Sequence, residues 1–305
     1  MAHSHGHMNH GHHADSRRLG IAFALILGFM AVEVVAGLLA DSLALLSDAA
    51  HMLTDAGAIG LALLAARLAR RPAGGGFTFG LRRAEILSAQ VNGATLVALA
   101  ALVIFEGVRR LVDPPDVAGG TVLAVALGGI VVNVAATVTL SGADRRSLNV
   151  EGAFQHVLTD LFAFIATAVA GAVIIATGWG QADGIAALIV AALMLRSGYG
   201  LLRDSGRILL EAAPRGLDPE QIGNALAAEH HVIEVHDLHV WEVSSGFPSL
   251  SAHVVVRPGC DTQSHRRQLA ELLRDRFGIE HSTLQVEAAH EGPLEIEPLK
   301  PGKGA

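Results

Sequence analysis

Apolar residues dominate the first two thirds of the chain, in runs long enough to cross a lipid bilayer. A spanning helix needs about 20 mostly apolar residues, and the sequence before residue 206 contains six such runs. We expect helices at residues 19–40, 43–66, 84–108, 119–141, 152–177 and 182–203. The pattern therefore predicts an all-α bundle of six transmembrane helices over residues 17–206.

The pattern changes after Pro214, where apolar residues occur in short segments separated by Gly, Pro and charged residues. Asp218 followed by Pro219 is typical of the start of a helix. Beyond it, the periodicity predicts strands at 232–243 and 250–256, an amphipathic helix at 262–277 and a last strand at 282–288. We therefore expect a small α+β domain of order αββαβ over residues 207–290, followed by a flexible tail at 291–305.

Composition supports the membrane assignment and limits the chemistry. Hydrophobic residues make up 51% of the chain and charged residues 17%, against about a quarter charged in soluble proteins. A single Cys excludes a disulfide within one chain, so metal ligands must come from the 16 His and the carboxylates. The net charge of -7 argues against a nucleic-acid partner. Six His lie in residues 1–16, a tail that we expect to be disordered.

The distribution of Arg predicts the orientation in the membrane. Short loops on the cytoplasmic side carry an excess of Lys and Arg, and most of the loop Arg residues fall on one side of the predicted bundle. Only Arg109 and Arg110 oppose this bias. We therefore expect a multi-pass protein of the inner (plasma) membrane with both termini and the α+β domain in the cytoplasm. The Arg residues on the cytoplasmic side are Arg17, Arg18, Arg67, Arg70, Arg71, Arg82, Arg83, Arg145 and Arg146.

Two predicted spans carry the same ionisable motif, a His followed four residues later by an Asp. The pairs are His51 with Asp55 and His156 with Asp160. Residues i and i+4 share one face of a helix, and an Asp at the centre of a spanning helix costs about 2.5 to 3.5 kcal/mol on insertion scales. If the two helices pack together, two imidazoles and two carboxylates surround one point. That is a ligand set for tetrahedral Zn²⁺.

Other interpretations of this pattern remain open. Each His–Asp pair can be a buried hydrogen-bonded couple that holds helices together, or the four groups can form a proton pathway without metal. Glu33, Glu85 and Asn133 also lie inside predicted spans and can line a polar pathway.

Longer stretches carry a resemblance to a known family. They are ADSLALLSDAAHMLTDAGAIGLALLA, FTFGLRRAEILSAQVNG, EGAFQHVLTDLFA, and VHDLHVWEV with SAHVVV. Over residues 17–288 the chain resembles the cation diffusion facilitator family, of the bacterial zinc transporter type. The resemblance implies a transport site formed by His51, Asp55, His156 and Asp160.

The resemblance also implies properties of the α+β domain. It predicts a homodimer with ferredoxin-like cytoplasmic domains that bind Zn²⁺ as a regulatory ligand. The metal residues matched by position are His236, His253, His281 and Glu287. We expect the remaining His of this domain to be solvated: His230, His231, His239, His265 and His290.

Together these features predict a membrane exporter that moves Zn²⁺, with Co²⁺ or Cd²⁺ as further substrates, out of the cytoplasm by alternating access, with protons as the counter-ion. The chain has no G-x-x-x-x-G-K-[ST] motif for ATP and no H-E-x-x-H motif of a metallopeptidase, so we expect a carrier that is not an enzyme. A membrane-embedded zinc sensor and a passive metal channel are the alternatives.

Overall fold

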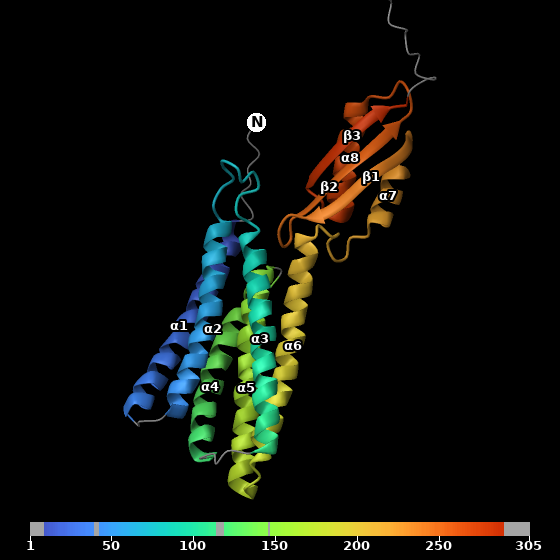
Figure 1. The fold of residues 1–305 in the computed structure, drawn as a ribbon. Helices are drawn as coiled ribbons and strands as arrows, with labels where there is room; N and C mark the ends of the chain where they lie inside the picture. The colour runs from blue at the N-terminus through green and yellow to red at the C-terminus, as the bar shows by residue number, and fades with distance from the viewer. Residues whose placement is uncertain (1–8, 40–42, 114–118, 146, 290–305) are drawn as a thin grey trace, which may run out of the picture. The chain divides into compact units, whose positions relative to one another are not determined.

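The computed structural model describes residues 9–39, 43–113, 119–145 and 147–289 (Figure 1). Within its helices some side chains lie outside the described set, including those of His51 and Asp55. The chain forms two compact units. One contains the long helices up to Leu210 together with Val243–Gly246, and the other contains the remaining residues.

The described part of the first unit contains six long helices, which agrees with the all-α bundle predicted from hydropathy. Four of them contain segments long and apolar enough to cross a bilayer: Ala84–Val112, Leu123–Ser141, Leu148–Thr177 and Gln181–Leu209. The described apolar part of the second helix, Ala56–Ala69, is shorter. The bounds of the helices are α1 Asn9–Leu39, α2 Leu43–Ala69, α3 Ala84–Val112, α4 Gly119–Ser141, α5 Leu148–Thr177 and α6 Gln181–Leu209.

Helices α1, α2, α4 and α5 share one apolar core. It includes Ile26 of α1, Met52 and Ile59 of α2, Leu140 of α4 and Val157 of α5, all at most 2% exposed. On α5, residues 150, 153, 154 and 157 supply the buried stripe, a spacing of three to four residues that keeps apolar side chains on one helical face. This packing fixes α5 against α2.

Helices α3 and α6 pack closely at two glycine pairs. A Cβ added at Gly93 would lie 3.0 Å from the carbonyl oxygen of Gly198, and one added at Gly198 would lie 2.9 Å from that of Gly93. Gly107 and Gly184 repeat the arrangement, since a Cβ at Gly184 would lie 2.9 Å from the Gly107 oxygen. Small residues permit such approach of two backbones, which drives helix association in membranes where the hydrophobic effect does not.

The second unit has the order α7 (Pro219–Ala227), β1 (Val232–Glu242), β2 (Pro248–Val256), α8 (Thr262–Phe277) and β3 (His281–Ala288). The sheet order is β1-β2-β3, with β1 and β2 antiparallel and β2 and β3 parallel. Both helices lie on the same face of the sheet (Figure 1). The predicted αββαβ order, and with it the predicted fold class, is confirmed.

Helix caps and strand alternation explain these elements. The Asp218 side chain accepts a hydrogen bond from the Glu220 backbone N–H at 3.0 Å, so Asp218 is the N-cap that the sequence predicts. Along β2, residues 250, 252, 254 and 256 are buried, whereas His253 is partly exposed on the opposite face. The His residues of the sheet therefore lie on the face away from this apolar core.

Candidate metal sites

One half of the predicted membrane site is described, and it lies on α5. His156 is 1% exposed and the Asp160 side chain 13% exposed, and the distance from His156 Nε2 to Asp160 Oδ2 is 3.8 Å. The helix places both groups on one face because they are four residues apart. An imidazole and a carboxylate buried side by side form a two-donor arrangement suited to a divalent cation or a proton.

The other half of the motif lies on α2, where the side chains of His51 and Asp55 are outside the described set. Their neighbours Met52 and Ala56 are 2% and 3% exposed and belong to the same apolar core as Val157. Closer to the start of α5, Asn149 Nδ2 donates a hydrogen bond to the Ala62 carbonyl oxygen on α2, at 2.8 Å. The segments that carry the two motifs thus belong to helices in direct contact.

Two of the three other polar residues predicted to line a pathway, Asn133 and Glu85, are buried. Asn133 of α4 is 1% exposed, and its Nδ2 donates to the Gly129 carbonyl oxygen at 3.1 Å. Glu85 of α3 is 8% exposed and accepts a hydrogen bond from Ser147 Oγ at 3.1 Å. The side chain of Glu33 lies outside the described set.

A second cluster lies on the exposed face of the sheet in the α+β unit. His236 on β1 and His253 on β2 are register partners, with ring centroids 5.3 Å apart. The ladder is irregular between His236 and His239, and Asp237 within this bulge has a φ of 52°. A bulge turns a side chain away from the regular alternation. Asp237 Oδ1 is 3.0 Å from His239 Nε2, and its Oδ2 is 3.9 Å from His253 Nε2.

The bulge therefore adds two groups to the predicted pair. His239, which the sequence predicted to be solvated, is hydrogen-bonded to Asp237, although its side chain remains 66% exposed. Asp237 could not be predicted from the sequence, because regular alternation places neighbouring residues on opposite faces. The HDLH segment contains both Asp237 and His239. The sequence does not show, however, that a register shift brings their side chains together.

The register of β3 determines where the other two predicted residues, His281 and Glu287, lie relative to His253. Gln285 is opposite His253, Glu287 is opposite Val255, and His281 is opposite Ser249. His281 is therefore displaced from His253 by four residues, about 13 Å along a strand. The structure brings together His236 and His253 but does not bring His281 to them. Glu287 lies on their face of the sheet, two residues beyond Gln285.

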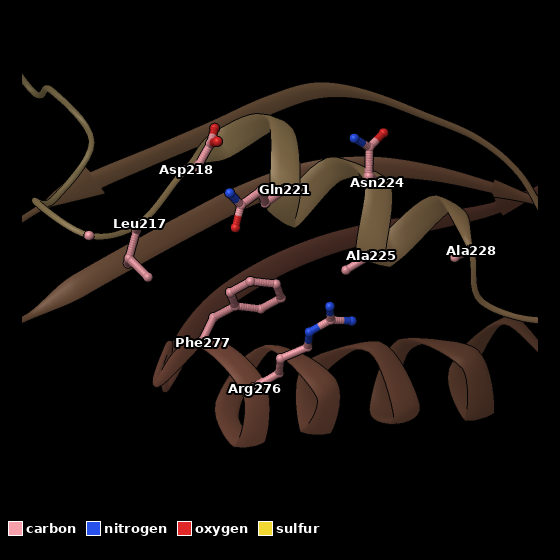
Figure 2. A pocket seen from close by; sticks show the side chains of 9 residues that line it. Leu217, Asp218, Gln221, Asn224, Ala225, Ala228, Arg276 and Phe277 are labelled. Carbon is pink, nitrogen blue, oxygen red and sulfur yellow. The ribbon is translucent and has the colours of Figure 1, made fainter.

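Among the described side chains, no three His, Cys, Asp or Glu residues already surround a single point as metal ligands do. A cavity of about 700 Å³ lies between α7 and the end of α8, with Arg276 and Phe277 below α7 (Figure 2). It is lined by no imidazole, and its carboxylate, Asp218, caps α7. The lining of this cavity therefore lacks the set of ligands that a metal site needs.

Comparison with known proteins covers both units. Residues 19–210 match the family described as the cation efflux transmembrane domain, and residues 214–289 match the cation efflux protein cytoplasmic domain.

Three relatives match over nearly their whole length. The chain is 42% identical to the zinc transporter ZitB of Escherichia coli (strain K12), over 94% of this chain and 93% of that protein. It is 40% identical to the cadmium, cobalt and zinc/H(+)-K(+) antiporter of Bacillus subtilis (strain 168), over 92% of each. It is 38% identical to the metal cation efflux system protein CzcD of Cupriavidus metallidurans, over 94% and 90%.

Among solved structures, the metal-bound C-terminal domain of the CzcD transporter is 33% identical, covers 23% of this chain and 99% of that chain, and has a TM-score of 0.23. The two family matches together cover most of the sequence, and the relatives match from end to end. The chain therefore belongs to the cation efflux family, also called the cation diffusion facilitators.

Proposed function

We propose that this protein exports Zn²⁺ from the cytoplasm in exchange for protons, with Co²⁺ and Cd²⁺ as further substrates. The observation that carries the proposal is the buried His156–Asp160 pair on α5, together with the same His-x-x-x-Asp motif on α2. The printed names of the relatives, which include a zinc transporter and a cadmium, cobalt and zinc antiporter, support the same substrate class.

Competition for the same ligand atoms couples the two fluxes. Metal binds imidazole and carboxylate groups in their deprotonated forms, so metal binding releases protons and protonation releases metal. Imidazole is the side chain whose ordinary pKa lies closest to neutral pH. Zn²⁺ reaches His51, Asp55, His156 and Asp160 from the cytoplasm, the helices rearrange, and protons from the other side replace it. The N/O ligand set holds zinc without thiolates, since the chain has a single Cys.

The test is zinc transport in proteoliposomes with and without an imposed pH gradient. We expect that zinc accumulates only when protons can move in the opposite direction, and that Asp160→Asn abolishes this accumulation. Asp204→Asn, which removes a carboxylate from α6 outside the motif, is the matched control and should transport normally. Zinc flux that follows only its own gradient would identify a passive channel, and normal transport by Asp160→Asn would exclude the proposed site.

The sheet face is our proposed regulatory site. His236 and His253, with Asp237 beside them, are the residues that we propose to bind Zn²⁺ there; His281 and Glu287 remain weaker predictions of the sequence. We further propose a homodimer in the inner membrane, with both termini cytoplasmic, a membrane domain at 17–206 and a cytoplasmic domain at 207–290.

A further inference from the structure

Three imidazoles gather at one end of the α+β unit, away from the sheet face. His230 and His231 lie between α7 and β1, and His265 lies in the first turns of α8. The ring centroids of His230 and His231 are 3.9 Å apart, and those of His231 and His265 are 5.7 Å apart. The sequence predicts that these residues are solvated.

Strand pairing brings the two segments together. The Arg257 backbone N–H donates to the His231 carbonyl oxygen at 2.9 Å, which extends the pairing of Val232 with Val256. The chain then turns through Gly259 and Asp261 into α8. The start of β1 and the start of α8 are thereby held at the same end of the α+β unit.

His231 is constrained in two ways. Its φ is 70°, in the left-handed region that is uncommon for residues other than Gly, with Asn, Asp and His the most frequent exceptions. Its Nδ1 is buried and has no hydrogen-bond partner, a state that costs free energy for a polar atom. An uncommon backbone conformation and an unsatisfied buried nitrogen at one residue are features that functional sites preserve.

His265 is already oriented as a ligand. Its Nδ1 lies 3.0 Å from the Asp261 carbonyl oxygen, so this nitrogen carries the proton and donates it. Metal-bound imidazoles usually donate their other ring N–H to a backbone carbonyl or carboxylate in this way. The arrangement leaves Nε2 of His265 with its lone pair available.

We propose that His230, His231 and His265 form a second divalent-metal site in this unit, selective for Zn²⁺ and similar cations that prefer nitrogen ligands. With Zn–N distances of about 2.0 Å, two imidazoles on one tetrahedral ion have centroids about 5 Å apart, a value between the two observed separations. The three donors do not yet surround one point, so the rings of His230 and His231 turn about their side-chain torsions when metal binds.

The charges around His231 and the distance of the site from the sheet face further define it. Burial, and then the charges of His230, His265 and Arg257, lower the pKa of His231, so its ring is neutral at neutral pH. Arg257 opposes a cation, and water or a carboxylate from solvent would complete the coordination. His231 precedes His236 by five residues, about 16 Å along a strand, so the site is separate from the sheet face.

Footprinting of the intact protein tests the proposal without mutation. Metal-free protein in detergent is treated with diethyl pyrocarbonate at neutral pH, with and without Zn²⁺, and modification of each His is quantified by peptide mass spectrometry. We expect Zn²⁺ to lower the modification of His231 and His265 at least fivefold, and Mg²⁺, which prefers oxygen ligands, to have no effect. Unchanged modification of both residues would overturn the proposal.

Two variants give an independent measurement by equilibrium dialysis and metal analysis. His265→Gln removes a ligand, and His231→Asn does so with a residue that tolerates positive φ. Each should bind one zinc ion fewer per chain than the wild type. Arg267→Gln, an exposed neighbour on α8, should keep the full number. Full zinc content in both His variants, with unchanged thermal midpoints in chelator, would also refute the site.

Discussion

The glycine crossing of α3 and α6 allows a matched pair of substitutions two residues apart on one helix. A Cβ at Gly198 would lie 2.9 Å from the Gly93 carbonyl oxygen and 2.8 Å from Val97 Cγ2. A Cβ at Gly200 would meet nothing within 4 Å. Gly198→Ala and Gly200→Ala therefore make the same chemical change on the same helix, but only the first forces α3 and α6 apart.

The expected difference follows from two opposing contributions. Replacing Gly by Ala in a helix interior stabilises it by about 1 kcal/mol in water, and both variants gain this. Overpacking a close contact costs about 1–3 kcal/mol, and a backbone carbonyl cannot rotate away as a side chain can. We expect Gly200→Ala to be neutral or slightly stabilising, and Gly198→Ala to be about 1–3 kcal/mol less stable than Gly200→Ala.

Reversible unfolding in mixed micelles of detergent and SDS, followed by circular dichroism, measures this difference. Gly93→Ala, whose Cβ would lie 3.0 Å from both the Gly198 oxygen and Leu201 Cβ, should resemble Gly198→Ala. If Gly198→Ala and Gly200→Ala unfold within about 0.5 kcal/mol of each other, the close crossing does not stabilise the bundle and the reasoning is wrong.

Three other predictions follow from the structure. Arg110→Met should destabilise the bundle by about 1–2 kcal/mol, because Arg110 Nη1 is 2.5 Å from Asp183 Oδ2. The double variant Arg110→Met with Asp183→Asn should recover part of the lost stability in the same unfolding assay. If the double variant recovers none of it, the two residues are not coupled. The lowered pKa of His231 means that the unfolded chain binds more protons, so stability should rise with pH between that lowered pKa and about 6.5. His231→Asn should remove this contribution in thermal melts at pH 5.5 and 7.5 in chelator, and an unchanged slope would contradict it. Cys260, the single Cys and partly exposed, should react with a membrane-impermeant maleimide in inside-out vesicles but not in intact cells, and labelling of intact cells would reverse the proposed orientation.

Local spacing explains what the sequence could predict. The i, i+4 relation between His156 and Asp160, the Asp218–Pro219 helix start and the alternation along β2 all depend on residues close together in the chain. Each is therefore decided by helix or strand geometry before any tertiary contact forms. The αββαβ order and the long apolar helices follow from the same periodicities.

Tertiary register explains what the sequence could not predict. Asp237 reaches His239 only because the β1–β2 ladder slips by one residue at the bulge. His265 reaches His231 only because the end of β2 pairs beside the start of β1. Arg110, which opposed the positive-inside bias, is paired with Glu106 and Asp183. Apart from the i,i+4 contact of Arg110 with Glu106, these relations leave no periodic signal, since each depends on a pairing between distant segments.

The paired glycines of α3 and α6 also restrict how this sequence can change. In most packed interfaces, a larger residue on one helix can be accommodated by a smaller residue opposite it. At Gly93 and Gly198 an added Cβ would meet side chains of the other helix and also the backbone carbonyl oxygen of the opposite glycine. A smaller side chain can relieve the first contact, but no substitution removes the carbonyl oxygen. An enlargement at either position therefore has no single compensating substitution across the interface, and only a shift of the helices themselves can relieve it.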